Sequence, residues 1–173
     1  MPTLEINLFD YAKGVEQLEK YYDSFNKAID DGIAEVVVRL EKRLKQYITE
    51  YDIPESIGTT VNSIKVDNGF MIVIDSEIGM FFEYGTGIVG SENPHPVVPA
   101  GWTYDVNQHG EMGWWYPTTE SDPNPYKWVD GSGQLRGWTK GKPSMPYMHK
   151  TYLYGRRIIK RTLNKHLKKV KLK

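Results

Sequence analysis

The chain has 173 residues, of which 39% are apolar and 25% charged, and its 22 acidic residues balance its 22 lysines and arginines. This composition is typical of a folded globular protein and argues against global disorder. The absence of cysteine excludes disulfide frameworks, thiolate catalysis and cysteine zinc sites. No apolar run approaches the ~20 residues that span a bilayer. The start of the chain lacks the basic-then-apolar pattern of a secretory signal. We therefore expect synthesis in the cytoplasm and no membrane partner.

The charges are unevenly distributed along the chain. All 22 acidic residues lie between Glu5 and Asp130, whereas residues 131–173 contain 13 lysines and arginines and no acid. Such an asymmetry predicts a basic C-terminal segment with an anionic partner. That partner could be nucleic acid or an acidic face on a neighbouring subunit.

A long amphipathic helix is predicted from about Gly14 to Tyr51. Its apolar residues recur at gaps of three and four, from Leu18 to Ile48, with charged residues on the remaining face. Gly32 predicts a kink, because glycine weakens a helix. Pro54 ends the pattern.

Two strands are predicted next, around an Asn68-Gly69 turn, the strongest two-residue hairpin signal. Val66 should then face Met71, and Ile64 should face Val73. Because the second strand is apolar on both faces, we expect it to be central in its sheet. The aromatic residues of 79–84 predict a third strand.

Residues 85–143 are rich in Gly, Pro and Trp and predict a small antiparallel meander inserted into the domain, with one strand rejoining the main sheet. Turns are expected at 108–110 and 131–133. Five tryptophans make this insert a candidate interface: Trp102, Trp114, Trp115, Trp128 and Trp138. Such aromatics could form the insert's own core, a contact with other subunits, or a surface on which sugars or unpaired bases stack.

A second amphipathic helix is predicted from Ser144, a plausible N-cap, to about Lys168. Its outer faces are basic, and four of its residues are candidate contacts for an anionic partner: Arg156, Arg157, Lys160 and Arg161. The whole sequence therefore predicts a single α+β domain spanning 1–173, with both helices packed on a small antiparallel sheet and residues 85–143 as its β-rich insert.

None of the residue groups that could support catalysis or bind a cofactor has a pattern specific enough to identify an enzyme. Residues 85–90 match the dinucleotide pattern G-x-G-x-x-G, but the prolines after it should forbid the helix that the pattern requires. A metal site at His95, Asp105 and His109 and a carboxylate pair from Asp75, Glu77 and Glu83 lack a diagnostic spacing. We predict neither catalytic residues nor a cofactor or metal.

One segment resembles a known family. Phe82-Glu83-Tyr84-Gly85-Thr86-Gly87 is similar to the (V/F)EYGTG signature of the gene-10-like tail-component family of long-tailed phages. Further segments follow in the family's order: Pro94-His95-Pro96, Gly101–Asp105, Gly113–Tyr116, Trp138–Gly141, and Pro143 through Pro146-Tyr147-Met148. The family also resembles this chain in its long N-terminal helix, its hairpin and its sheet, so the combined pattern spans about Gly14 to Leu167. Tyr147 stands where the family often has Phe.

The resemblance implies a virion structural protein, not an enzyme. The family's members are tail, neck or head–tail joining proteins, which form rings around the DNA channel. The partners implied are copies of the chain itself, neighbouring head-completion and tail-tube proteins, and non-specific contact with DNA in the channel. The expected location is the virion, at the tail or the head–tail junction, after synthesis in the host bacterial cytoplasm. A carbohydrate- or cell-wall-binding module built on the tryptophans is the alternative, and a nucleic-acid-binding protein is a third hypothesis.

Overall fold

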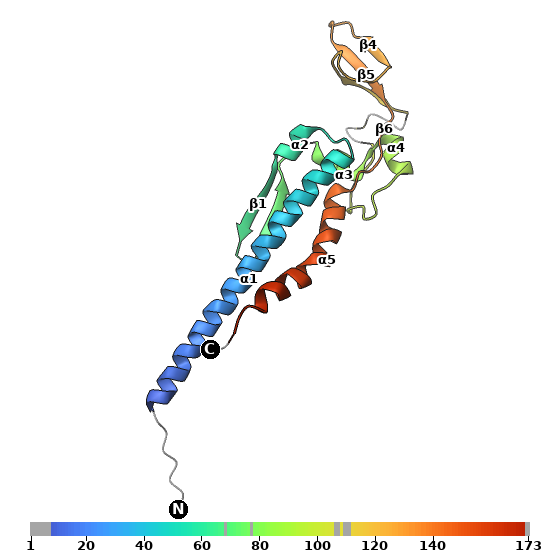
Figure 1. Ribbon diagram of the computed structural model, residues 1–173. Helices are drawn as coiled ribbons and strands as arrows, with labels where there is room; N and C mark the ends of the chain where they lie inside the picture. Colours follow the sequence, from blue (N-terminus) through green and yellow to red (C-terminus); the bar gives the residue numbers. More distant parts are fainter. Residues whose placement is uncertain (1–7, 68, 77, 106–107, 109–111, 172–173) are drawn as a thin grey trace, which may run out of the picture. The chain divides into compact units, whose positions relative to one another are not determined.

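The computed structural model describes residues 8–67, 69–76, 78–105, 108 and 112–171. It confirms the α+β class, with a long N-terminal helix, a C-terminal helix and small antiparallel sheets (Figure 1). The elements are α1 Leu8–Glu50, α2 Glu55–Thr59, β1 Val61–Val66, β2 Gly69–Ile74, α3 Gly79–Tyr84, α4 Gly87–Glu92, β3 Trp114–Pro117, β4 Lys127–Val129, β5 Leu135–Thr139, β6 Gly141–Lys142 and α5 Tyr147–Leu167.

The chain divides into two compact units. The first comprises α1 up to Leu44, residues 62–73 of the β1–β2 hairpin, and α5 from Thr151 onward. The second comprises residues 45–61 and 74–150. The second unit contains the predicted 85–143 insert, but it also includes the elements on either side of that segment.

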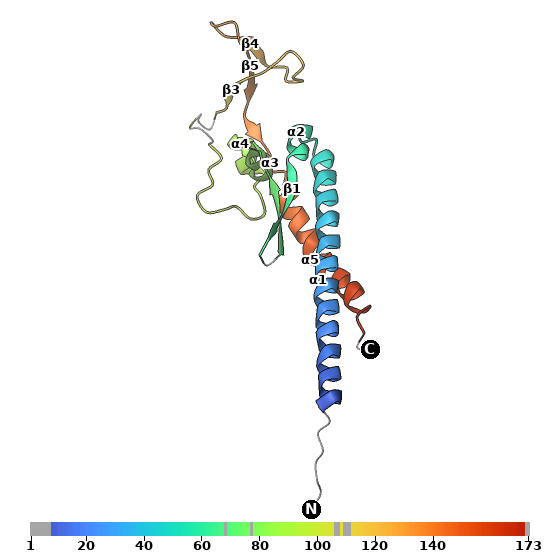
Figure 2. The same ribbon diagram turned by 90° about the vertical axis from the view of Figure 1, so that its left-hand side faces the viewer.

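The helix α1 is continuous over 43 residues, so it starts earlier than the sequence predicts and passes through Gly32 without a break (Figure 2). The apolar stripe of α1 is buried in the C-terminal half of the helix and exposed in the N-terminal half. Val36 is 5% exposed and Leu44 is fully buried, whereas Leu18 is 60% exposed and Tyr22 is 65% exposed. The N-terminal half of α1 therefore presents an apolar stripe that no described residue covers.

Within the first unit, α5 packs against α1, and two glycines allow the helices to approach closely. A Cβ added at Gly32 would lie 2.9 Å from a methyl carbon of Leu163, and one added at Gly155 would lie 3.1 Å from Leu40. Gly32 thus serves helix packing and does not kink α1.

Polar contacts join the same two helices. The Glu35 carboxylate accepts hydrogen bonds from Lys165 and His166, both at 2.9 Å. These donors hold the pKa of Glu35 at about 2. The Arg39 guanidinium also donates to the Thr162 hydroxyl, at 3.3 Å.

The hairpin is a separate two-stranded sheet, so the expectation of a central, covered second strand is wrong. No described residue of β2 is fully buried, and Ile64, Phe70 and Met71 are all exposed apolar side chains. In the first unit the hairpin runs alongside α1 (Figures 1 and 2). Asn68 lies outside the described residues, and the predicted face-to-face register stays a prediction.

Residues 79–84 form the helix α3 and not the predicted strand. Their buried positions, Gly79, Phe82 and Glu83, have the three-and-four spacing of a helix face. After Gly85 and Thr86, residues 87–92 form the short helix α4, so the expectation that the prolines forbid a helix there is wrong. The prolines follow this helix, after Glu92.

The tryptophan-rich segment forms a three-stranded antiparallel sheet of order β3-β5-β4. It is not a meander, because β3 pairs with β5 and not with its sequence neighbour. The predicted turn at 131–133 joins β4 to β5, with the Gly133 N–H donating to the Asp130 carbonyl at 2.9 Å. The turn expected at 108–110 lies largely outside the described residues. No described strand joins this sheet to the hairpin.

We expect Gly32→Val to destabilise the protein by about 1–3 kcal/mol relative to Gly14→Val, because overpacking at the helix contact forces α5 to shift. Gly14 is the matched control, since an added Cβ there meets nothing within 4 Å. Urea unfolding followed by circular dichroism measures the difference. Equal unfolding midpoints for the two variants would contradict the packing role of Gly32.

Candidate functional site

The signature residues assemble around one buried carboxylate. Glu83 lies on α3 and is 5% exposed. Its Oε2 accepts the backbone N–H of Met148 at 2.8 Å, and its Oε1 accepts that of His149 at 2.9 Å. These are first-turn N–H groups of α5, which have no partner within the helix. Glu83 therefore caps α5 from a distant part of the sequence, where a negative charge also suits the helix dipole.

A buried histidine supports the same carboxylate. His95 Nε2 lies 3.0 Å from Glu83 Oε1. Its Nδ1 lies 2.6 Å from the carbonyl oxygen and 2.9 Å from the nitrogen of Val97. Because a carboxylate only accepts, Nε2 is the donor in the contact with Glu83. The ring also packs edge-on against Tyr84 and His149, with centroids 4.8 and 5.1 Å away.

The predicted N-cap Ser144 has a different role. Its hydroxyl donates to the Glu83 carbonyl at 2.8 Å, while the Met145 N–H donates to the Phe82 carbonyl at 2.8 Å. The Tyr147 hydroxyl donates to the Gly79 carbonyl at 2.8 Å. Burial, and then the nearby Glu83 charge, raise the pKa of Tyr147, which keeps this hydroxyl a donor. These hydrogen bonds connect the start of α5 to both ends of α3.

The glycines of the signature permit a close backbone crossing. Gly85 and Gly87 have φ of +80° and +62°, in the region of backbone conformation that glycine adopts readily. A Cβ at Gly87 would lie 2.3 Å from the Lys140 carbonyl oxygen. Thr86 and Gly87 form bridges with Lys142 and Gly141. The dinucleotide pattern requires a strand before its first glycine, whereas the element before Gly85 is the helix α3, so the pattern lacks its structural context.

The other catalytic candidates are not brought together. The Glu83 carboxylate accepts hydrogen bonds from the first turn of α5. Asp75 is exposed, and Glu77 lies outside the described residues. The described residues hold no cluster of three metal-ligating side chains, and His109 lies outside them. Within the described part of the chain, no helix has the length and apolar character needed to cross a membrane.

Three of the predicted interface tryptophans share one face of the three-stranded sheet. Trp115 pairs with Trp138, and Trp128 pairs with Arg136, two residues from Trp138 on β5. The Trp115 ring lies 5.2 Å from the Trp138 ring and 6.0 Å from the Trp128 ring. Trp115 is 43% exposed and Trp128 is 54% exposed. This face, which we call the tryptophan face, is both a small aromatic cluster and an accessible surface.

The remaining two tryptophans, Trp102 and Trp114, are partly exposed and lie next to the signature residues. Trp114 lies on the opposite face of β3, near the Gly87 crossing. Trp102 packs against Tyr84 and Phe81, with centroids 5.1 and 6.3 Å away. Both residues therefore pack beside the signature, and their role as interface residues stays a prediction.

The predicted anionic-partner residues Arg156, Arg157, Lys160 and Arg161 are all exposed on α5. Arg157, Lys160 and Arg161 line a shallow groove of about 650 Å³. Within the described residues none of the four pairs with an acidic side chain. The basic face is therefore available to a partner.

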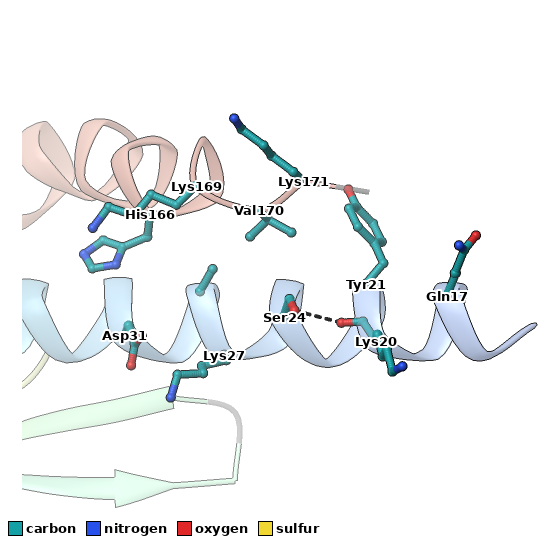
Figure 3. Close-up of a pocket in the computed structure, with 11 residues that line it drawn as sticks. Gln17, Lys20, Tyr21, Ser24, Lys27, Asp31, His166, Lys169, Val170 and Lys171 are labelled. Atoms are coloured by element: carbon teal, nitrogen blue, oxygen red, sulfur yellow. Dashed lines mark hydrogen bonds between the residues drawn. The ribbon is translucent and has the colours of Figure 1, made fainter. Parts of the chain in front are cut away.

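A second groove, of about 580 Å³, lies in the first unit between α1 and the chain end after α5 (Figure 3). Tyr21 and Val170 contribute its apolar surface. Its lysines include Lys20, Lys27 and Lys169. The Lys20 ammonium forms an ion pair with the Glu16 carboxylate at 2.5 Å. The groove extends the basic character of the C-terminal segment but assembles no catalytic group.

Comparisons with known protein families, curated proteins and solved structures found no match to this chain. The family resemblance accordingly rests on the sequence motifs. Sequence reasoning missed the capping role of Glu83 and its support by His95. A local signal was present, because the first turn of α5 contains no acidic residue that could serve its own N–H groups.

We expect Glu83→Ala to lower the free energy of unfolding by about 2–4 kcal/mol, because it leaves two part-buried N–H groups and the buried His95 without their partner. Glu83→Gln should cost less, since its single carbonyl oxygen can serve one N–H. Chemical denaturation measures both, with the exposed Glu92→Ala as control. A Glu83→Ala midpoint equal to that of the control would refute the capping role.

Proposed function

We propose that this chain is a structural subunit of a long-tailed phage virion, located at the head–tail junction or the tail end. Its role would be that of a connector or neck, tail-completion or tail-terminator protein, forming a ring around the DNA channel. The ordered motif set centred on residues 82–87 carries this proposal. The protein would act by binding and not by catalysis.

Two structural features support an assembly role. The stripe of α1 that is buried at Val36 and Leu44 continues uncovered at Leu18 and Tyr22. Exposed apolar surface of this kind marks interaction sites. The hairpin contributes further exposed apolar side chains on a sheet that has only two strands. A two-stranded sheet leaves edges open to pairing with another chain.

The proposed partners follow from the same features and the resemblance. They are copies of this chain, neighbouring head-completion and tail-tube proteins, and DNA in the channel, contacted without sequence preference. Arg156, Arg157, Lys160 and Arg161 are the candidate contacts for an acidic neighbour or for phosphates.

A stop codon at Lys13 in the phage gene tests the proposal by electron microscopy of the lysate. We expect DNA-filled heads beside separate tails of normal length for a joining or completion role. Tails of uncontrolled length would instead identify a terminator. A suppressor host that restores full-length protein is the control. Intact, infectious particles made without the protein would refute a structural role.

The tryptophan face favours one alternative, a carbohydrate- or cell-wall-binding module, because exposed indole rings stack on sugars. It predicts that Trp115→Ala and Trp128→Ala lose retention on purified peptidoglycan while circular dichroism stays unchanged. Arg161→Ala, which belongs to the other unit, is the control. Failure of the wild-type protein to bind peptidoglycan would remove this alternative.

A further inference from the structure

The uncovered stripe of α1 is bordered by acidic residues on one side. Val15, Leu18 and Tyr22 are exposed apolar side chains. At 100° per residue, Glu19 and Asp23 lie next to this stripe on the same flank of the helix. In the described part of the chain, neither carboxylate has an ion-pair partner. We call the stripe with this border the acidic-apolar face.

The helix α5 carries a surface of the opposite charge. Tyr152 is 59% exposed and Ile159 is 43% exposed, and their spacing of seven residues places them on the same side of α5. Arg156 and Lys160 border these apolar residues on one flank. We call this surface the basic-apolar face.

The two faces match in spacing as well as in charge. Val15 and Tyr22 are seven residues apart, as are Tyr152 and Ile159, which corresponds to about 10 Å along a helix. The acids Glu19 and Asp23 are four apart, as are Arg156 and Lys160. Side chains three, four and seven apart share a helix face, so each helix presents one apolar row beside one charged row.

We infer that the acidic-apolar face of one copy docks on the basic-apolar face of a second copy. The inference rests on the proposed function, because the contact would join neighbouring subunits of the proposed ring. Both faces belong to every copy and are different surfaces, so the contact is head-to-tail and repeats until a ring closes. DNA could satisfy the basic row, but it would leave Tyr152 and Ile159 uncovered and would not explain the exposed row on α1.

Charge reversal tests the contact. One variant carries Glu19→Lys and Asp23→Lys, and the other carries Arg156→Glu and Lys160→Glu. We expect each variant alone to lose self-association, with a dissociation constant raised at least about tenfold in light scattering at low salt. Mixed in equal amounts they should reassemble, because each reversed face then meets a partner of opposite charge. The control is Glu92→Lys, an exposed position on α4 that belongs to neither face.

Cysteine pairing provides a second measurement that does not depend on charge. The chain lacks cysteine, so Leu18→Cys in one preparation and Ile159→Cys in another introduce single thiols. Under mild oxidation we expect a disulfide dimer in the mixture and little in either preparation alone. Equal cross-linking of Leu18→Cys with itself would replace the head-to-tail contact with a symmetric one and overturn the inference.

Failure of this inference can be told apart from failure of the proposed function. The inferred contact is wrong if the charge-reversed variants assemble like the wild type, or if the wild type does not self-associate. In either case the stop-codon phenotype still tests the proposed structural role independently. If the reversal on α5 abolishes binding to duplex DNA and leaves self-association intact, the basic face serves DNA and the inference is overturned.

Discussion

The hydrogen bonds from the start of α5 to the buried carboxylate of Glu83 are the constraint on which the second unit depends. A helix start leaves N–H groups that must be satisfied, and here the acceptor comes from a helix more than 60 residues earlier in the sequence. The same carboxylate is reached by His95, so one anionic group joins α3, the segment after α4 and α5. A buried charge is costly unless it is fully paired, which explains why three donors converge on it.

That anchor also explains the signature around it. The alternation of a helix end, a tight turn and a second helix start requires backbone conformations that glycine adopts readily, at Gly85 and Gly87. The absence of side chains there lets the strand-like segment of Lys140–Lys142 cross at backbone contact distance. The signature thus has a physical role in assembling the fold of the second unit.

In contrast to the buried hydrogen bonds at Glu83, the solvent-exposed surfaces of α1 and α5 carry apolar and charged side chains. In the first unit the helices α1 and α5 are joined by Glu35, Lys165 and His166 and by the close contact at Gly32. What they leave uncovered is an acidic-apolar row on one helix and a basic-apolar row on the other. A chain with zero net charge can in this way carry two strongly charged, complementary surfaces, which is the property that a subunit of a repeating assembly needs.

The sequence by itself determined the two amphipathic helices, the hairpin and the turn at 131–133, because periodicity and turn chemistry are local properties of neighbouring residues. It also located the signature and the exposed basic residues of α5. Only the tertiary structure decided that residues 79–84 are helical, since an aromatic hexapeptide favours a strand until Glu83 finds its partners on α5. The order β3-β5-β4 and the uncovered part of the α1 stripe were likewise decided by distant segments. Burial and long-range pairing depend on which segments meet, and no local pattern in one sequence contains that information.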